Sequence, residues 1–176
     1  MKVRCCMFRS GSFKLFLLPI LVVALLAVFL IIVFTKGHPK SPATVEQVSS
    51  ALEKNGFDAV DLTNDYQEKW NMDSVLKNAV VCEEDDLRFD FFVFDSEQNA
   101  DYVRVKYQTH IRENGYANPN IEIAEGATNY MLYTIKAKGV YTINMRVANT
   151  LVYAYCNEEN ANKLNAIMRE LGYFDE

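Results

Sequence analysis

The chain has 176 residues, a hydrophobic content of 50% and a formal net charge of −5, which suits one domain with a short appendage. The charge is unevenly divided, because residues 41–176 hold all 23 acidic residues and only 12 of the 18 basic ones, a formal net charge of −11. Nucleic acids and bare anionic lipid headgroups repel such a surface, so the composition excludes a nucleic-acid-binding role.

An uncharged apolar run, LFLLPILVVALLAVFLIIVF, occupies residues 15–34. At about 1.5 Å per residue, a helix of this length spans the roughly 30 Å hydrocarbon layer of a membrane. Four basic residues precede the run and two follow it, which favours a cytoplasmic N-terminus. A cleaved signal peptide is the alternative, but the run is longer than a usual secretory core and only Thr35-x-Gly37 follows as a small-x-small site.

Four parts are therefore predicted along the chain. They are a basic cytoplasmic N-terminus (1–14), a transmembrane helix (15–34), a linker (35–43) and an extracytoplasmic domain (44–176). The linker assignment rests on GHPKSPA, which has two prolines and no apolar cluster. The expected location is the cell membrane, crossed once and contacted through residues 15–34.

Three helix endings follow from a repeated pattern, in which an apolar residue, three mostly polar residues, a glycine and an aromatic residue stand in succession: LEKNGF (52–57), IRENGY (111–116) and MRELGY (168–173). A glycine just beyond a helix adopts the left-handed conformation, and the flanking apolar residues then touch in a Schellman ending. The predicted caps are Gly56, Gly115 and Gly172. The corresponding helices begin at Pro42 or Thr44, at a capping box of Asp95 with Gln98, and at Asn157.

Between the helices, apolar residues alternate with a period of two, as in strands. The predicted strands are NAVVCE (78–83), DLRFDFFVF (86–94), NYMLYTIKA (129–137), VYTINMRV (140–147) and TLVYAYC (150–156), with NIEIA (120–124) a weaker candidate. Lys138-Gly139 and Ala148-Asn149 suit tight hairpins. Residues 64–74 are compatible with a short helix or a loop.

This order predicts an α+β fold, α-ββ-α-βββ-α, preceded by the transmembrane helix. It has one antiparallel sheet of about five strands, with three helices packed against a face of it.

Residues with possible chemistry are few. EEDD (83–86) lacks the spacing of a calcium loop and suits a solvated hairpin turn. His110 is the only histidine of the domain and sits on a helix without a nucleophile–base pattern. No segment has the composition of a catalytic, metal-binding or cofactor-binding site, so the sequence predicts a protein that is not an enzyme and needs no cofactor.

Two further groups are candidates for other roles. Cys82 and Cys156 both lie in the predicted outer domain, where an oxidising environment permits a disulfide between them. Trp70, with Tyr133, Tyr153 and Tyr155, is a candidate partner surface for a glycan or protein, although strand tyrosines also pack at the rim of a core.

The segments LEKNGF, VDLTND, FFVFDSEQNA, NTLVYAYCNEENA and RELGYFDE, behind a single anchor, resemble small membrane-anchored extracytoplasmic proteins of low-GC Gram-positive, often gut-dwelling, bacteria. The resemblance implies no activity and no catalytic residue. The leading hypothesis is a non-enzymatic, membrane-tethered binding or sensing domain. The alternatives are a ligand carrier or enzyme with a cleft beside residues 64–74, and a component of an envelope assembly with a protein partner.

Overall fold

The computed structural model describes residues 38–84, 87–113, 121–127 and 129–175. The predicted membrane span at 15–34 lies outside the described residues, as do Gly115 and the tip of the acidic turn at Asp85 and Asp86. Within the described part of the chain, no helix is long and apolar enough to cross a membrane.

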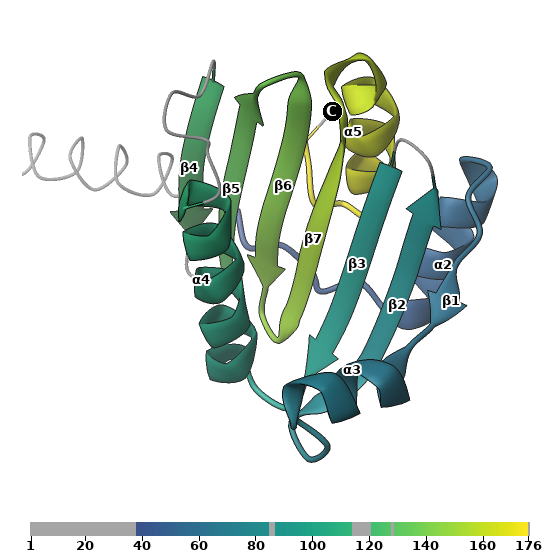
Figure 1. The fold of residues 1–176 in the computed structure, drawn as a ribbon, viewed down its shortest axis with the longest axis vertical. Coiled ribbons are helices and arrows are strands. Elements are labelled where there is room, and N and C mark those ends of the chain that lie inside the picture. Colours follow the sequence, from purple (N-terminus) through teal and green to yellow (C-terminus); the bar gives the residue numbers. More distant parts are fainter. Residues whose placement is uncertain (1–37, 85–86, 114–120, 128, 176) are drawn as a thin grey trace, which may run out of the picture. The chain divides into compact units, whose positions relative to one another are not determined.

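One antiparallel sheet has the strand order β1-β2-β3-β7-β6-β5-β4 (Figure 1). Its strands are β1 (Val60–Asp61), β2 (Leu76–Glu84), β3 (Leu87–Phe94), β4 (Ile121–Ala127), β5 (Tyr130–Ala137), β6 (Val140–Val147) and β7 (Thr150–Asn157). The predicted α+β class is confirmed, but the sheet has seven strands rather than about five. The two edge strands carry a weak signal, because both residues of β1 and residues 123–126 of β4 are exposed.

Four helices occur in the described residues, where three were predicted. They are α2 (Val45–Lys54), α3 (Thr63–Trp70), α4 (Glu97–Glu113) and α5 (Ala161–Glu170), the last preceded by a short 3₁₀ turn, η1 (Glu158–Asn160). The additional helix is α3, which lies in the segment that the sequence leaves open between helix and loop. The N-terminal cap of α4 also differs from the predicted one, because Ser96 Oγ, not Asp95, accepts from the backbone N–H of Asn99.

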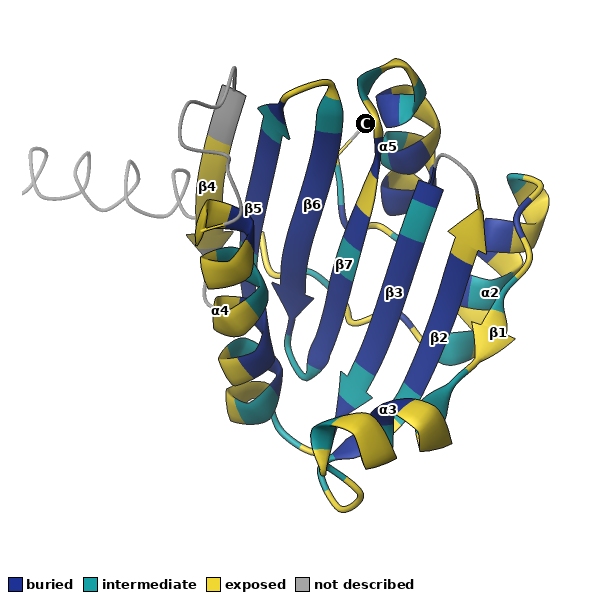
Figure 2. Cartoon of the chain, in the orientation of Figure 1, coloured by how far each residue is buried: buried dark blue, intermediate teal, exposed yellow. Residues whose placement is uncertain are grey.

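The helices cover both faces of the sheet, whereas the prediction placed them on one (Figure 1). On one face, α2 packs on β2 and α5 packs on β7; on the other, α3 packs on β2 and α4 crosses β3, β6 and β7. The central strands are therefore buried along most of their length (Figure 2). Thr142, Asn144 and Arg146 of β6, the side that the period-two pattern leaves polar, are buried on the α4 face.

Two of the three glycine-ended helices have the hydrogen bonds of a Schellman ending. Gly56 has a φ of +84°, and the amide of Phe57 donates to the carbonyl of Leu52 at 3.0 Å. Gly172 has a φ of +69°, and the amide of Tyr173 donates to the carbonyl of Met168 at 2.8 Å. Phe57 and Tyr173 are both buried in the α2–α5 core, so each ending fastens its helix to that core.

Replacing Gly56 by alanine should lower the free energy of unfolding by about 1 kcal/mol, because an L-residue resists a positive φ. Space is not the cause, since an added Cβ at Gly56 meets no atom within 4 Å. Gly56→Asn is the matched control and should lose less, because asparagine visits the left-handed region more readily. Urea unfolding of the two variants compares them, and equal losses would contradict a conformational origin.

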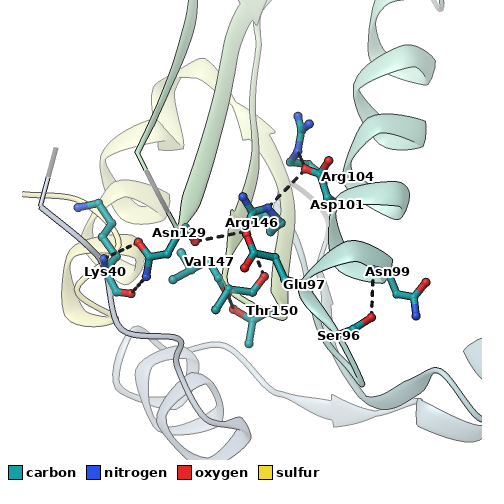
Figure 3. Close-up of polar contacts among 11 residues, drawn as sticks. Lys40, Ser96, Glu97, Asn99, Asp101, Arg104, Asn129, Arg146, Val147 and Thr150 are labelled. Atoms are coloured by element: carbon teal, nitrogen blue, oxygen red, sulfur yellow. Dashed lines mark hydrogen bonds and ion pairs between the residues drawn. The ribbon is translucent and has the colours of Figure 1, made fainter. Parts of the chain in front are cut away.

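The chain at the end of the predicted linker is hydrogen-bonded to the domain. The backbone N–H of Lys40 donates to Asn129 Oδ1 at 3.1 Å, and the Lys40 carbonyl accepts from Asn129 Nδ2 at 2.6 Å (Figure 3). The amide of Ala43 donates to the Tyr173 hydroxyl at 2.9 Å, and that hydroxyl shares a further hydrogen bond with Thr150. The segment that leads into α2 is thus hydrogen-bonded to the domain at both Lys40 and Ala43.

Candidate functional site

Five aromatic side chains form a connected layer on the face of the sheet that carries α3 and α4. Trp70 of α3 has its ring centroid 4.8 Å from that of Tyr66 and 4.9 Å from that of Phe92 on β3. Tyr107 of α4 lies 6.3 Å from Phe92 and stacks on Tyr153 of β7 at 4.2 Å. Ring contacts of this kind contribute about 0.5–1.5 kcal/mol each beyond their burial, so the layer links α3 to α4 across β3.

A cavity of about 510 Å³ opens between the end of α3 and α4, above this layer. It is lined by Lys69, Trp70, Met72, Val103, Lys106, Tyr107 and His110. The four residues from α4 recur at helical spacing and form one stripe. The volume falls in the range of roughly 300–1,000 Å³ that is typical of small-molecule sites. Three of the lining residues belong to the 64–74 segment, beside which the sequence places the cleft of the carrier or enzyme alternative.

A charged pair on β3 lies next to the layer. Arg88 Nε donates to both carboxylate oxygens of Asp90, at 2.9 and 3.1 Å. Its two terminal nitrogens donate to Glu83 at 2.7 Å and to the Tyr66 hydroxyl at 2.9 Å. Asp90 is only 2% exposed, whereas Glu83 is largely in solvent. Arg88 therefore ties a buried carboxylate to the helix that carries Trp70.

Burial governs the ionisation of these groups. It raises the pKa of Asp90 to about 6, against the opposing attraction of Arg88. Burial also raises the pKa values of Tyr66 and Tyr107 above the ordinary tyrosine value, so both hydroxyls stay neutral and act as hydrogen-bonding groups at physiological pH.

The four aromatic residues predicted as a partner surface share one face of the sheet but differ in burial. Tyr155 is 36% exposed, Trp70 and Tyr153 are half-buried, and Tyr133 is 1% exposed. Tyr133 therefore does not contribute to an exposed patch, because it packs with Ile111 of α4 in a small core of its own. Trp70 instead forms a wall of the cavity.

The disulfide that the sequence permits between Cys82 and Cys156 is absent, and both residues are buried thiols. Cys82 lies on β2 opposite Phe89, and Cys156 lies on β7 opposite Leu87, so β3 runs between them. Two strand spacings account for about 9–10 Å across the sheet, and the offset of two residues between Phe89 and Leu87 adds to this separation, so the two thiols lie beyond the reach of a disulfide. Burial raises the pKa of the Cys82 thiol to about 11, which suppresses the reactive thiolate.

A second polar cluster joins α4 to β6. Arg146 is 6% exposed, pairs with Glu97, and has its Nε 3.4 Å from Asp101 (Figure 3). Arg104 Nε donates to the same Asp101 at 2.7 Å, and Asn144 Nδ2 donates to the Arg104 carbonyl at 2.9 Å. This cluster was not predicted from the sequence. Two features could have indicated it, namely the polar residues at alternate positions of β6 and the acidic residues Glu97 and Asp101, four residues apart on α4. The charged groups of this cluster pair with each other, so the cluster fixes α4 against β6 and has a structural role.

No group of three or more His, Cys, Asp or Glu that would hold a metal ion occurs in the part of the chain that the structure describes. The charged side chains in the described lining of the cavity are the lysines Lys69 and Lys106, and the imidazole of His110 lies in the same lining. The site is therefore an apolar, aromatic recess with the lysines Lys69 and Lys106 in its described lining.

The fold defines the class of this protein as an α+β domain with helices on both faces of a seven-stranded antiparallel sheet. No protein-family model matches the chain, and no curated protein matches it significantly. Among solved structures, it is similar to a GTP-binding regulator from Thermotoga maritima, with 14% identity, a TM-score of 0.44, and coverage of 79% of this chain and 95% of that one. A likeness at this level carries no functional argument.

Proposed function

We propose that this protein is a membrane-tethered, extracytoplasmic binding domain, non-enzymatic, whose ligand occupies the cavity between α3 and α4. The observation that supports the proposal most strongly is the cavity itself, with a volume of about 510 Å³ and aromatic walls from Trp70 and Tyr107. Clusters of exposed aromatic surface around a recess mark binding sites more often than chance. The tether and its orientation rest on residues 15–34 and their flanking charges.

The site contains a built-in reporter, because Trp70 is the only tryptophan of the chain. We expect a panel of small aromatic acids, amides and alcohols to include compounds that shift Trp70 fluorescence saturably in the full-length protein, reconstituted in phosphatidylcholine nanodiscs. Tyr107→Ala, which removes the second aromatic side chain of the lining, should weaken that binding at least about tenfold, the ratio that ~1.4 kcal/mol produces.

Tyr155→Ala is the matched control, because Tyr155 lies on the same face of the sheet and outside the cavity lining. It should leave binding unchanged. If Tyr155→Ala weakens binding and Tyr107→Ala does not, the ligand binds on the open sheet surface and the proposed site is wrong.

A further inference from the structure

The charge around the cavity is opposite to that of the domain that contains it. Residues 41–176 carry 23 acidic and 12 basic side chains, yet the charged residues of the described lining are Lys69 and Lys106. Among the described residues, the lining contains two lysines and no carboxylate, and such a local excess of positive charge attracts anions.

The two lysines are available to a ligand. Lys69 Nζ stands 5.6 Å from the centroid of the Tyr66 ring, and Lys106 Nζ stands 4.4 Å from that of Tyr102. Among the described residues, neither ammonium group forms an ion pair with a carboxylate, although Lys69 attracts the buried Asp90 at longer range and thereby, against the larger effect of burial, lowers its pKa. Contacts of an ammonium group with an aromatic face at exposed sites are weak, about 0.5–1 kcal/mol, and a charge-assisted hydrogen bond to an anion is stronger.

The interior of the cavity selects a different chemistry from its rim. Trp70, Met72, Val103 and the ring of Tyr107 present apolar surface, which favours a hydrocarbon or aromatic body. The net charge of −11 opposes a polyanion, which would meet acidic surface on every side of the recess. A small molecule with one acidic group satisfies both requirements.

We infer that the cavity binds an amphipathic organic anion, with its aromatic or aliphatic body against the apolar surface that Trp70 and Tyr107 form together and its carboxylate, or equivalent acidic group, held by Lys69 and Lys106. This inference rests on the proposed function and names the chemical class of its ligand.

The test compares two probes of nearly equal shape, 3-phenylpropionate and its neutral amide. Both are titrated into the full-length protein in phosphatidylcholine nanodiscs, with Trp70 fluorescence and calorimetry as readouts. We expect the anion to bind about tenfold or more tightly than the amide, since a difference of ~1.4 kcal/mol gives that ratio. The preference should weaken as salt rises, because exposed charges are screened.

The variant Lys69→Met/Lys106→Met keeps the length of both side chains and removes their charges. It should bind the amide as the unaltered protein does and lose the preference for the anion. Lys54→Met/Lys163→Met is the matched control, since both of these lysines are exposed on helices of the other face, and it should keep the preference.

A wrong ligand class and a wrong binding site give different results. Equal binding of the acid and the amide, unaffected by Lys69→Met/Lys106→Met, overturns the ligand class and leaves the proposed site in place. Absence of binding by both probes at millimolar concentration, together with no response from the wider panel, overturns the proposed function and this inference with it.

Discussion

Replacing Arg88 by methionine is expected to lower the free energy of unfolding by about 3 kcal/mol near pH 7. The substitution keeps most of the aliphatic packing but removes the cation from Asp90, which is 2% exposed and accepts both of its short hydrogen bonds from Arg88 Nε. Breaking a buried ion pair from one side leaves an uncompensated charge, and this costs about 3–5 kcal/mol in well-buried cases. Arg88 itself is partly exposed, so the lower end of that range applies.

The loss should depend on pH in a defined direction. Burial raises the pKa of Asp90 from 3.8 to about 6, so the folded protein binds a proton there more readily than the unfolded chain does. Protonation of Asp90 therefore stabilises the folded state. This contribution to the free energy of unfolding is complete below the pKa of the unfolded chain, 3.8, and is lost as the pH rises through the folded pKa of about 6. Without Arg88 the folded pKa rises further, so Arg88→Met should recover more stability than the unaltered protein between about pH 7 and pH 5.

Urea unfolding at the two pH values measures both effects, with Arg88→Met/Asp90→Leu as the control. The double variant replaces the pair by apolar side chains and should regain most of the lost stability, as buried ion pairs commonly allow. A double variant as unstable as Arg88→Met at both pH values would show that packing by Arg88, and not the stranded charge of Asp90, accounts for the loss.

The second large effect is expected from Phe92→Ala, which should destabilise the domain by about 4 kcal/mol, within the range for phenylalanine truncated in a core. Phe92 is 0% exposed, and its ring contacts those of Tyr66, Trp70, Phe94 and Tyr107. Its loss removes the support beneath Trp70. We therefore expect a red shift of Trp70 emission in the folded variant and weaker binding of 3-phenylpropionate.

Phe91→Ala provides a close control, because Phe91 is the adjacent residue and points into the core on the opposite face of the same strand. It should destabilise the protein by a similar amount and leave Trp70 emission unchanged. A red shift of equal size in both variants would mean that general loosening of the domain, rather than loss of the cavity floor, moves the emission.

Much of the fold was predictable because local chemistry specifies it. The hairpin at Lys138 and Gly139, both with positive φ, follows from its two-residue turn, and the ends of α2 and α5 follow from Gly56 and Gly172. The second layer of helices was not predicted, because a period-two pattern says which side chains share a face and not whether a helix covers the polar one. Asn144 and Arg146 are polar yet buried, and α4 supplies a partner to each of them.

The candidate site was harder to predict than the fold. Trp70 was a candidate as one of four aromatic residues of a possible partner surface, but its neighbours in space, Val103 and Tyr107, come from a helix more than thirty residues further along the chain. Asp90 lies between Phe89 and Phe91. A carboxylate within so apolar a strand could have indicated a buried charge with a partner. Tyr133 was misplaced because an alternating strand does not distinguish a tyrosine at the edge of a core from one beneath a helix.

The strand order has a consequence for how this chain is made. Consecutive strands pair in the ribbon β2–β3 and in the ribbon β4–β5–β6–β7, but the two ribbons join only where β3 meets β7, about 55 residues later. Early in synthesis, β3 is therefore an edge strand whose partner β7 has not yet been made. At a synthesis rate of roughly 5–20 residues per second, the edge of β3 stays unpaired for several seconds, until β7 has been synthesised as far as residue 157. The joining step should limit the folding rate, and this interval is when the nascent chain most needs a chaperone.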